Sequence, residues 1–185
     1  MENKEKFEQY KKLLIDWSKK INLVAKSTLS DIDQRHIADS AQLADFIPKN
    51  TFIIDLGSGA GFPAVVLAIM GWKVTCIESI GKKTDFLIAV KNELGLTNLQ
   101  IYHGRVENFI KTLPRDSEYI FTARAFAPLV KILDYVHNVN YRLFLLKGHN
   151  ITEEIMVAKQ KYKFKHTLYP SKTGDGFITI IQKGR

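Results

Sequence analysis

Apolar side chains near the start of the chain recur every three or four residues, the spacing of one face of a helix. This stripe predicts an amphipathic helix over Glu5–Lys20 and consists of Phe7, Tyr10, Leu14, Trp17 and Ile21. A second helix is predicted to end near Phe46, because Ser30 followed by two aspartates has the form of an N-cap with an acidic first turn. Both helices need a neighbour that covers their apolar faces.

From residue 51 onward, short apolar runs alternate with helical patterns. The predicted strands are Thr51–Leu56, Lys73–Ile77, Leu99–Tyr102, Tyr119–Thr122 and Tyr141–Leu146. The predicted helices between and after them are Pro63–Met70, Lys82–Leu94, Val106–Thr112, Pro128–Val136 and Thr152–Lys161. This alternation predicts βαβ units and a parallel sheet. Two last strands, Lys163–Tyr169 and Phe177–Gln182, are close enough in sequence to form an antiparallel hairpin.

The pattern therefore predicts an α/β fold of the Rossmann-like, doubly wound kind, with a mostly parallel seven-stranded sheet. With 185 residues, 45% of them hydrophobic, the chain has the size of one domain. We expect a helical extension over 1–47 and a sheet core over 51–185.

Charge and cysteine content restrict the surroundings of the protein. Lys plus Arg exceed Asp plus Glu by 27 − 19 = 8, which favours a polyanionic partner such as nucleic acid, although a basic surface without a ligand explains the excess equally well. The single cysteine, Cys76, lies inside a predicted strand and can form no intramolecular disulfide. No apolar run approaches the roughly 20 residues of a membrane span, and no signal peptide is evident, so we expect a cytoplasmic protein without a membrane partner.

The turn after the first predicted strand contains three alternating glycines, Gly57, Gly59 and Gly61, followed by Pro63. Glycine allows a ligand to approach the backbone closely, and the start of the following helix favours a carboxylate or phosphate. A dinucleotide site needs G-x-G-x-x-G, whereas this turn is G-x-G-x-G preceded by Asp55, which favours a smaller zwitterionic ligand. Glu78, at the end of the second strand, can accept both hydroxyls of a ribose in either class.

Several motifs along the chain together carry a resemblance to a known family. Asp55–Pro63 resembles motif I of class I S-adenosylmethionine methyltransferases. The remaining motifs are Arg35-His36-x-x-Asp39-Ser40, Glu78-Ser79-x-Gly81-Lys82-Lys83, Gly104-Arg105-Val106-Glu107, Arg124-Ala125-Phe126-Ala127 and Leu146-Lys147-Gly148. In this order they resemble the RsmG (GidB) family of 16S rRNA guanine-N7 methyltransferases. The resemblance implies a class I methyltransferase fold, S-adenosylmethionine as cofactor, and small-subunit ribosomal RNA, either free or within a ribosomal particle, as partner.

The cofactor-binding residues expected from the turn and the strand end are Asp55, Gly57, Gly59, Gly61 and Glu78. The resemblance adds four more: Phe62, Val106, Glu107 and Arg124. Phe62 stands where the family more often has leucine, and we expect this apolar exchange to be tolerated. Ala60 stands where a proline is common, which should loosen the turn slightly.

The residues at the expected site favour a reaction that needs no general base. Methylating an amine or a hydroxyl requires loss of a proton, and C5 methylation usually requires a cysteine nucleophile, for which Cys76 is misplaced. Guanine N7 carries a free lone pair and needs only alignment. We therefore expect Arg124 to be the catalytic residue in a positioning role, by binding guanine O6, a phosphate or the cofactor carboxylate, although a structural salt bridge is the simpler alternative.

Six residues are expected to face RNA. Arg35, His36 and Ser40 fall on adjacent turns of the second helix, where an Arg35–Asp39 ion pair is an equally good explanation of the spacing; the resemblance favours a wall on the substrate side. Lys82 and Lys83 open a helix against its dipole, a placement that phosphate binding would explain, and Lys147 follows the fifth strand. The five histidines lack the spacing of metal ligands, so we expect no metal.

Two other functions remain open at this point. The chain could be a Rossmann-like nucleotide-binding regulator without catalysis, or a methyltransferase for a small molecule or a protein. RNA binding that weakens steeply with salt would separate the RNA enzyme from the second alternative, because phosphate contacts release counterions.

Overall fold

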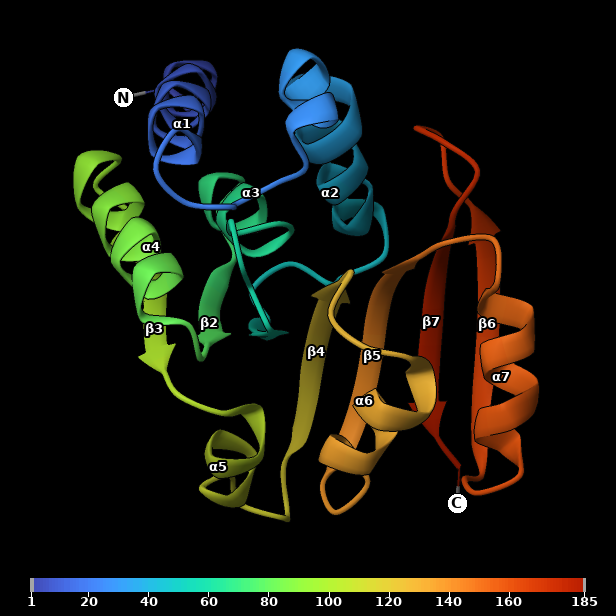
Figure 1. Cartoon of the computed structure of the whole chain (residues 1–185). Helices are drawn as coiled ribbons and strands as arrows, with labels where there is room; N and C mark the ends of the chain where they lie inside the picture. Colours follow the sequence, from blue (N-terminus) through green and yellow to red (C-terminus); the bar gives the residue numbers. More distant parts are fainter. Residues whose placement is uncertain (1, 185) are drawn as a thin grey trace.

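A seven-stranded sheet forms the centre of the molecule (Figure 1). The computed structural model describes residues 2–184. The strands are β1 (Phe52–Leu56), β2 (Lys73–Glu78), β3 (Leu99–His103), β4 (Glu118–Arg124), β5 (Asn140–Lys147), β6 (Phe164–Pro170) and β7 (Phe177–Lys183). Their order is β3-β2-β1-β4-β5-β7-β6, in which β7 runs antiparallel to both of its neighbours and the other pairs are parallel. The predicted fold and C-terminal hairpin are confirmed.

The order of the strands explains where ligands can bind. β1 pairs with β2 on one side and with β4 on the other, so the chain order reverses at β1. In open parallel sheets, a crevice forms at such a switch point, outside the carboxyl ends of the strands. The four residues that end β1 are fully buried, as expected for a central parallel strand covered on both faces. The glycine turn follows directly at this point.

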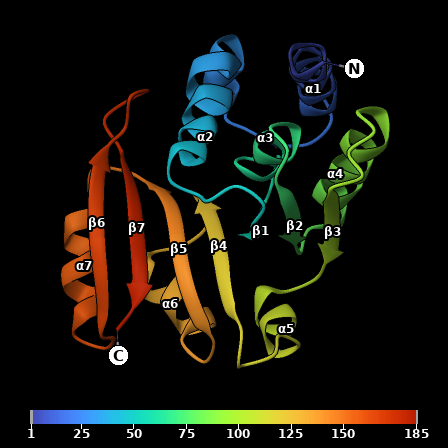
Figure 2. The same ribbon diagram turned by 180° about the vertical axis from the view of Figure 1, so that it is seen from behind.

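Helices cover both faces of the sheet (Figures 1 and 2). One face carries α1 (Asn3–Ser18), α3 (Ala64–Ile69), α4 (Gly81–Glu93) and the helical run that precedes β1; the other carries α5 (Val106–Lys111), α6 (Leu129–Val136) and α7 (Ile151–Lys159). Tyr10 and Leu14 of α1 are fully buried and belong to the same hydrophobic cluster as α3 and α4. The N-terminal helices therefore share a core with the sheet.

The second N-terminal helix differs from the prediction. It is a continuous run of η1 (Lys26–Asp31, 3₁₀), η2 (Asp33–Ala38, π-helical), α2 (Asp39–Ala41) and η3 (Gln42–Asp45, 3₁₀). The predicted cap at Ser30 is wrong, because that serine lies inside η1 and Ala25 occupies the cap position. The first turn is closed by Thr28, whose amide and hydroxyl both donate to the Ala25 carbonyl at 2.9 and 2.8 Å. A π-helical turn often marks a functional site.

The loop between β6 and β7 is tied to this helical run. The Gln42 side chain accepts a hydrogen bond from the Lys172 amide at 2.7 Å and donates to the Ser171 and Thr173 hydroxyls at 3.1 Å each. Lys172 also pairs with Asp45 at 3.1 Å. Segments that are far apart in the sequence are thereby brought together beside the carboxyl ends of β4 and β5.

Candidate active site

Two cavities meet at the carboxyl end of β4. The first, which we call the turn cavity, has a volume of about 520 Å³ and is lined by the glycine turn, Glu78 and His36. The second, the hairpin cavity, has a volume of about 580 Å³ and is lined by Arg35, Asp39, Lys147 and the β6–β7 loop. Arg124, Ala125 and Phe126 line both cavities, so this segment is their common wall.

The glycine turn has a backbone shape that only glycine adopts readily. Gly57 and Gly61 have φ values of +66° and +91°, in the left-handed region. A Cβ atom at Gly57 would collide with the ring of Phe126, and one at Gly61 with Val65. Gly57 and Gly59 line the turn cavity, whereas the predicted cofactor residue Gly61 is buried and lies off its wall. Gly61 therefore shapes the turn without lining the cavity.

Glu78 holds the turn in place through its carboxylate. One carboxylate oxygen accepts a hydrogen bond from the Gly59 amide at 2.8 Å, and the other accepts one from the Ile80 amide at 2.8 Å. The side chain is buried but lines the turn cavity. Because an ionised carboxylate has about four acceptor sites, Glu78 retains capacity for a ligand's hydroxyl groups.

Tyr10 is a residue of the site that the sequence analysis missed. Its hydroxyl donates a hydrogen bond to the Ala60 carbonyl at 2.6 Å, and its ring lies 5.3 Å from the ring of Phe62. Burial raises the pKa of Tyr10 well above its usual value, so the hydroxyl remains a donor. Helix α1 therefore fixes the turn at Ala60, where the expected proline is absent.

His36 lines the turn cavity, and its predicted contact with RNA is not supported by its position. Its exposed fraction is 6%, and its ring stacks on Phe62 with centroids 4.9 Å apart. Burial and the nearby Arg124 lower the pKa of His36 to about 4, so the ring is neutral at pH 7. The Thr28 hydroxyl already donates to Ala25, so it accepts the 2.8 Å hydrogen bond from His36 Nε2.

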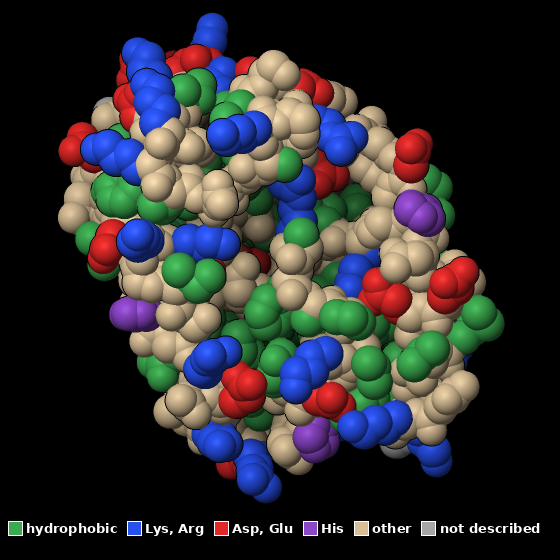
Figure 3. Space-filling model, in the orientation of Figure 1, with side chains coloured by type: hydrophobic (Ala, Val, Ile, Leu, Met, Phe, Trp, Pro, Cys, Tyr) green, Lys and Arg blue, Asp and Glu red, His purple; other side chains and the backbone are tan. Residues whose placement is uncertain are grey.

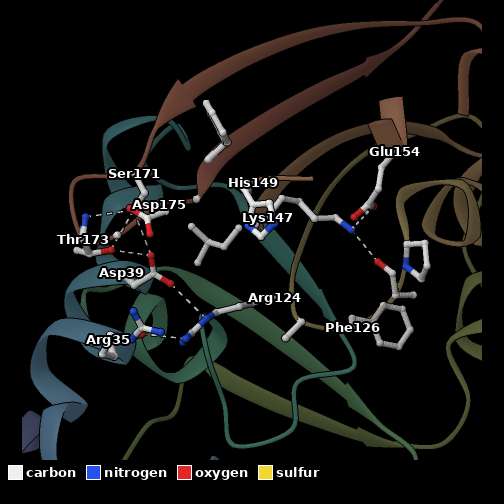
Figure 4. A pocket seen from close by; sticks show the side chains of 18 residues that line it. Arg35, Asp39, Arg124, Phe126, Lys147, His149, Glu154, Ser171, Thr173 and Asp175 are labelled. Atoms are coloured by element: carbon white, nitrogen blue, oxygen red, sulfur yellow. Dashed lines mark hydrogen bonds and ion pairs between the residues drawn. The ribbon is translucent and has the colours of Figure 1, made fainter. Parts of the chain in front are cut away.

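Arg124 is fixed from two sides at the end of β4 (Figure 4). Its Nε lies 3.2 Å from Asp39 Oδ2, and its Nη2 donates to the Arg35 carbonyl at 2.8 Å. The side chains of Arg124 and Asp39 are 21% and 19% exposed, so the pair is partly shielded from water. Asp39 thus pairs with Arg124 and not, as the alternative reading of the helix proposed, with Arg35. No hydrogen bond occupies Arg124 Nη1 within residues 2–184.

Asp39 connects Arg124 to the β6–β7 loop. Its Oδ1 accepts hydrogen bonds from the Thr173 hydroxyl at 2.8 Å and from Gln42 at 3.2 Å, while Oδ2 faces Arg124. Figure 4 shows Ser171, Thr173 and Asp175 beside Asp39 on one side of the hairpin cavity. The guanidinium of Arg35 lies near Gly174, within 3.9 Å of where a side chain there would begin. Arg35 is exposed, as its predicted contact with RNA requires.

Lys147 anchors the opposite wall of the hairpin cavity. Its ammonium donates to the Ala127 carbonyl at 2.8 Å and pairs with Glu154 at 2.7 Å, and only 11% of the side chain is exposed. Glu154 also accepts a hydrogen bond from the Leu129 amide at 2.6 Å. Lys147, expected to bind RNA, therefore holds the segment that follows β4 and is not free on the surface.

Val106 and Glu107 border a separate small cavity of about 60 Å³ beside Gly57. Gly57, Ser79 and Phe126 line both this cavity and the turn cavity, so these three residues form the boundary between the two spaces. The two predicted cofactor residues are thus near the glycine turn but do not line the turn cavity.

Three other predicted residues lie outside both large cavities. Asp55 is 1% exposed and accepts a hydrogen bond from the Thr122 hydroxyl at 2.6 Å, and burial raises its pKa to about 6. Its side chain is therefore too deeply buried to contact a ligand in the turn cavity directly. Ser40 is fully buried, so the prediction that it faces RNA is wrong for this conformation. Lys82 is exposed and lines neither cavity, whereas Lys83 lines the turn cavity.

Residues 2–184 give little support for three other features: a cysteine nucleophile, a cluster of metal ligands and a membrane-spanning helix. Burial raises the pKa of the Cys76 thiol, which makes it a poor nucleophile. These residues contain no group of three or more His, Cys, Asp and Glu side chains arranged to hold a metal ion. Within the same range, none of the helices has the length and apolar character that spanning a bilayer requires.

The fold and the glycine-turn site define a class I methyltransferase. Solved structures with the same fold include a putative methyltransferase from Streptococcus mutans in complex with SAH (TM-score 0.55, 17% identity, 78% of this chain and 95% of that chain). A putative S-adenosylmethionine-dependent methyltransferase from Methanococcus maripaludis is also similar (TM-score 0.61, 12% identity, 86% and 92%). At such identities the likeness concerns the fold alone.

The sequence comparisons are more specific. Residues 3–174 match the GidB family model, described as rRNA small subunit methyltransferase G. The chain is 39% identical to the ribosomal RNA small subunit methyltransferase G of Rickettsia prowazekii over 182 residues, which cover 96% of this chain and 92% of that protein. It is 40% identical to the protein of the same name from Hyphomonas neptunium over 175 residues, covering 90% and 81%. The chain belongs to the RsmG (GidB) family.

Proposed function

We propose that the chain methylates guanine N7 in small-subunit ribosomal RNA, with S-adenosylmethionine in the turn cavity and the acceptor guanine in the hairpin cavity. The observation that carries this assignment is the common wall of Arg124, Ala125 and Phe126, because groups held in the two cavities can meet only there. Family membership supports the rRNA substrate.

The residues that line the turn cavity suit the chemical groups of S-adenosylmethionine. Gly57 and Gly59 line the cavity with backbone and no side chain, and the buried Glu78 carboxylate can accept ribose hydroxyls. Arg124 supplies positive charge for the carboxylate of the amino-acid part. Asp55 acts from behind the turn, where it holds Thr122 of β4 against β1. When bound, S-adenosylmethionine supplies an electrophilic methyl group that guanine N7 can take up without losing a proton.

Arg124 is suited to orient the acceptor guanine. Its Nε and Nη2 are fixed by Asp39 and by the Arg35 carbonyl, which leaves Nη1 available. Guanine O6 is adjacent to N7 on the same edge of the base, so a hydrogen bond from Arg124 to O6 places N7 next to the common wall. Positioning of this kind accounts for rate acceleration without a general base.

The ionised groups of the hairpin cavity fit a reaction that needs no proton transfer. Asp39 pairs with Arg124 and Glu154 pairs with Lys147, so neither carboxylate is poised as a base near the common wall. These paired charges hold the cavity walls in position. The arrangement suits an acceptor nitrogen that already carries its lone pair.

The surroundings of the hairpin cavity suit a polyanion. Figure 3 shows a hollow in this face with Lys and Arg side chains at and around it. Arg35 at the mouth can bind the phosphate next to the inserted nucleotide, and Lys82 and Lys83 can contact RNA beyond the turn cavity. We place the reaction in the cytoplasm, on ribosomal RNA or a ribosomal particle.

The experiment is transfer of labelled methyl groups from S-adenosylmethionine to unmodified ribosomal RNA and to small-subunit particles, followed by chain scission at N7-methylguanine. We expect scission at a defined guanine, and Arg124→Ala should abolish most transfer while the fold is retained. Label at another position, or tight NAD binding without S-adenosylmethionine binding, would support a different enzyme or a regulator. Comparing RNA with particles identifies the preferred substrate.

A further inference from the structure

The ring of Phe126 lies where three cavities meet. It borders the turn cavity, the hairpin cavity and the small cavity beside Val106 and Glu107. It covers Gly57 so closely that a Cβ atom there would collide with three atoms of the ring. On its other side the ring leans on Tyr135, with centroids 5.9 Å apart. A movement of this one side chain would therefore change all three spaces.

In the present conformation, Phe126 blocks part of the space that the methyl donor needs. The cavity at Val106 and Glu107, where the resemblance places the donor, measures about 60 Å³. This is room for roughly two water molecules and is too small for an adenine ring system. Its boundary with the larger turn cavity consists of Gly57, Ser79 and Phe126, of which Phe126 alone has a large side chain. We infer that a donor that reaches from Glu78 to Val106 must displace this ring.

The backbone next to Phe126 is strained. Ala125 has a φ of +49°, in the left-handed region that residues with a Cβ atom rarely adopt. Such strain persists only where the surroundings enforce it, and it often marks segments that change conformation. Here the segment is held at both ends, by the contacts of Arg124 on one side and by the hydrogen bond from Lys147 to the Ala127 carbonyl on the other.

We propose that donor binding moves the Phe126 ring off Gly57 and into the hairpin cavity, where the ring becomes a stacking face for the acceptor base. This inference rests on the proposed function. The hairpin cavity is the free space on that side of the ring, and aromatic stacking is a common way to hold an unpaired base. The donor therefore binds before the RNA and increases the affinity for it.

The test measures RNA affinity with and without S-adenosylhomocysteine, and S-adenosylhomocysteine affinity alone, for the wild type and three variants. In the wild type, S-adenosylhomocysteine should tighten RNA binding. Phe126→Ala and Phe126→Leu should lose this effect and raise the KM for RNA roughly five- to hundredfold, the range for loss of one stacked base. Both should bind S-adenosylhomocysteine at least as well as the wild type, because no ring has to be displaced. Phe126→Tyr keeps the ring and should restore the coupling.

The outcomes separate this inference from the proposed function. A wild type that binds no S-adenosylhomocysteine, or methylates no RNA, contradicts the proposed function itself. A wild type that methylates RNA but binds it equally well with and without S-adenosylhomocysteine refutes the role of Phe126 alone. A Phe126→Leu variant with wild-type KM and coupling refutes it as well. Thermal unfolding of each variant measures how much the packing of Phe126 on Tyr135 contributes to stability. If Phe126 had a purely structural role, the variants would lose stability without losing the coupling between donor and RNA binding.

Discussion

Removing one hydroxyl group, in Tyr10→Phe, should destabilise both the fold and the glycine turn. The hydroxyl donates to the Ala60 carbonyl at 2.6 Å, and both residues are buried. The substitution leaves the ring in place and creates almost no cavity, so its main effect is an unpaired buried carbonyl. Leaving such a group without a partner costs about 1–3 kcal/mol, and we expect a loss of about 2 kcal/mol in the free energy of unfolding. Affinity for S-adenosylhomocysteine should fall because the turn is less ordered.

The assay is urea unfolding with and without saturating S-adenosylhomocysteine. We expect a single transition, because Tyr10 and Leu14 share a core with α3 and α4 and couple the N-terminal helices to the sheet. Tyr119→Phe is a matched control: its hydroxyl also donates to a backbone carbonyl, that of Pro114 at 2.8 Å, but on an exposed part of the surface and away from both cavities. It should change stability little and donor affinity not at all.

Equal effects of the two substitutions on donor affinity would refute the role assigned to α1. Wild-type stability of Tyr10→Phe would show that water or another donor satisfies the Ala60 carbonyl. Two separate transitions would show that the helical extension and the sheet core unfold independently.

Three further predictions concern the site. Asp39→Asn removes the ion pair of Arg124 and keeps its hydrogen bond to the Arg35 carbonyl. We expect kcat to fall about tenfold, equivalent to about 1.4 kcal/mol, with S-adenosylhomocysteine affinity unchanged; a normal kcat would show that Arg124 needs no ion pair. Gly57→Ala should destabilise the ligand-free protein more than Gly59→Ala: both glycines have positive φ, but only at Gly57 does the new methyl group meet the Phe126 ring, and equal losses in thermal unfolding temperature would contradict this reason. The pKa of Asp55 is raised to about 6 from the ordinary aspartate value of 3.8, so the folded state binds the carboxyl proton more tightly than the unfolded state does. Protonation of Asp55 therefore stabilises the fold below pH 3.8, and this stabilisation is lost as the pH rises through 6. Asp55→Asn should therefore gain stability relative to the wild type between pH 4 and 7, by at most about 3 kcal/mol, and a difference that is flat with pH would refute the shift.

The periodicity of the sequence was sufficient to predict the succession of strands and helices along the chain. Continuous apolar runs identify central parallel strands, and the short connection after β6 identifies the hairpin. The position of β7 between β5 and β6 depends on pairing across the sheet, for which no local pattern exists. The start of the second helix was misplaced because Ser30 resembles a cap, whereas Thr28 closes an earlier 3₁₀ turn.

The turn cavity was predictable from sequence because its main residues are neighbours in one motif or lie at a strand end. The hairpin cavity was not, because Asp39 and Thr173 meet only in the folded chain. Helical spacing put Ser40 and His36 on neighbouring turns, and the family resemblance assigned them to the RNA side. Neither the spacing nor the resemblance indicates whether these side chains are turned to solvent or to the core, and the structure buries both. Tyr10 carried no signal beyond that of an apolar helix position.

The central claim is that donor and acceptor occupy different cavities that meet at Arg124. Gly174→Phe tests it most directly, because Gly174 lines the hairpin cavity but not the turn cavity, and its position has room for a side chain to begin. It lies beside Arg35, which is on the side of the hairpin cavity away from Phe126 (Figure 4), so space for the Phe126 ring remains. We predict unchanged affinity for S-adenosylhomocysteine and loss of methyl transfer to ribosomal RNA. A parallel loss of S-adenosylhomocysteine affinity, or full activity with the hairpin cavity obstructed, would contradict the two-cavity account.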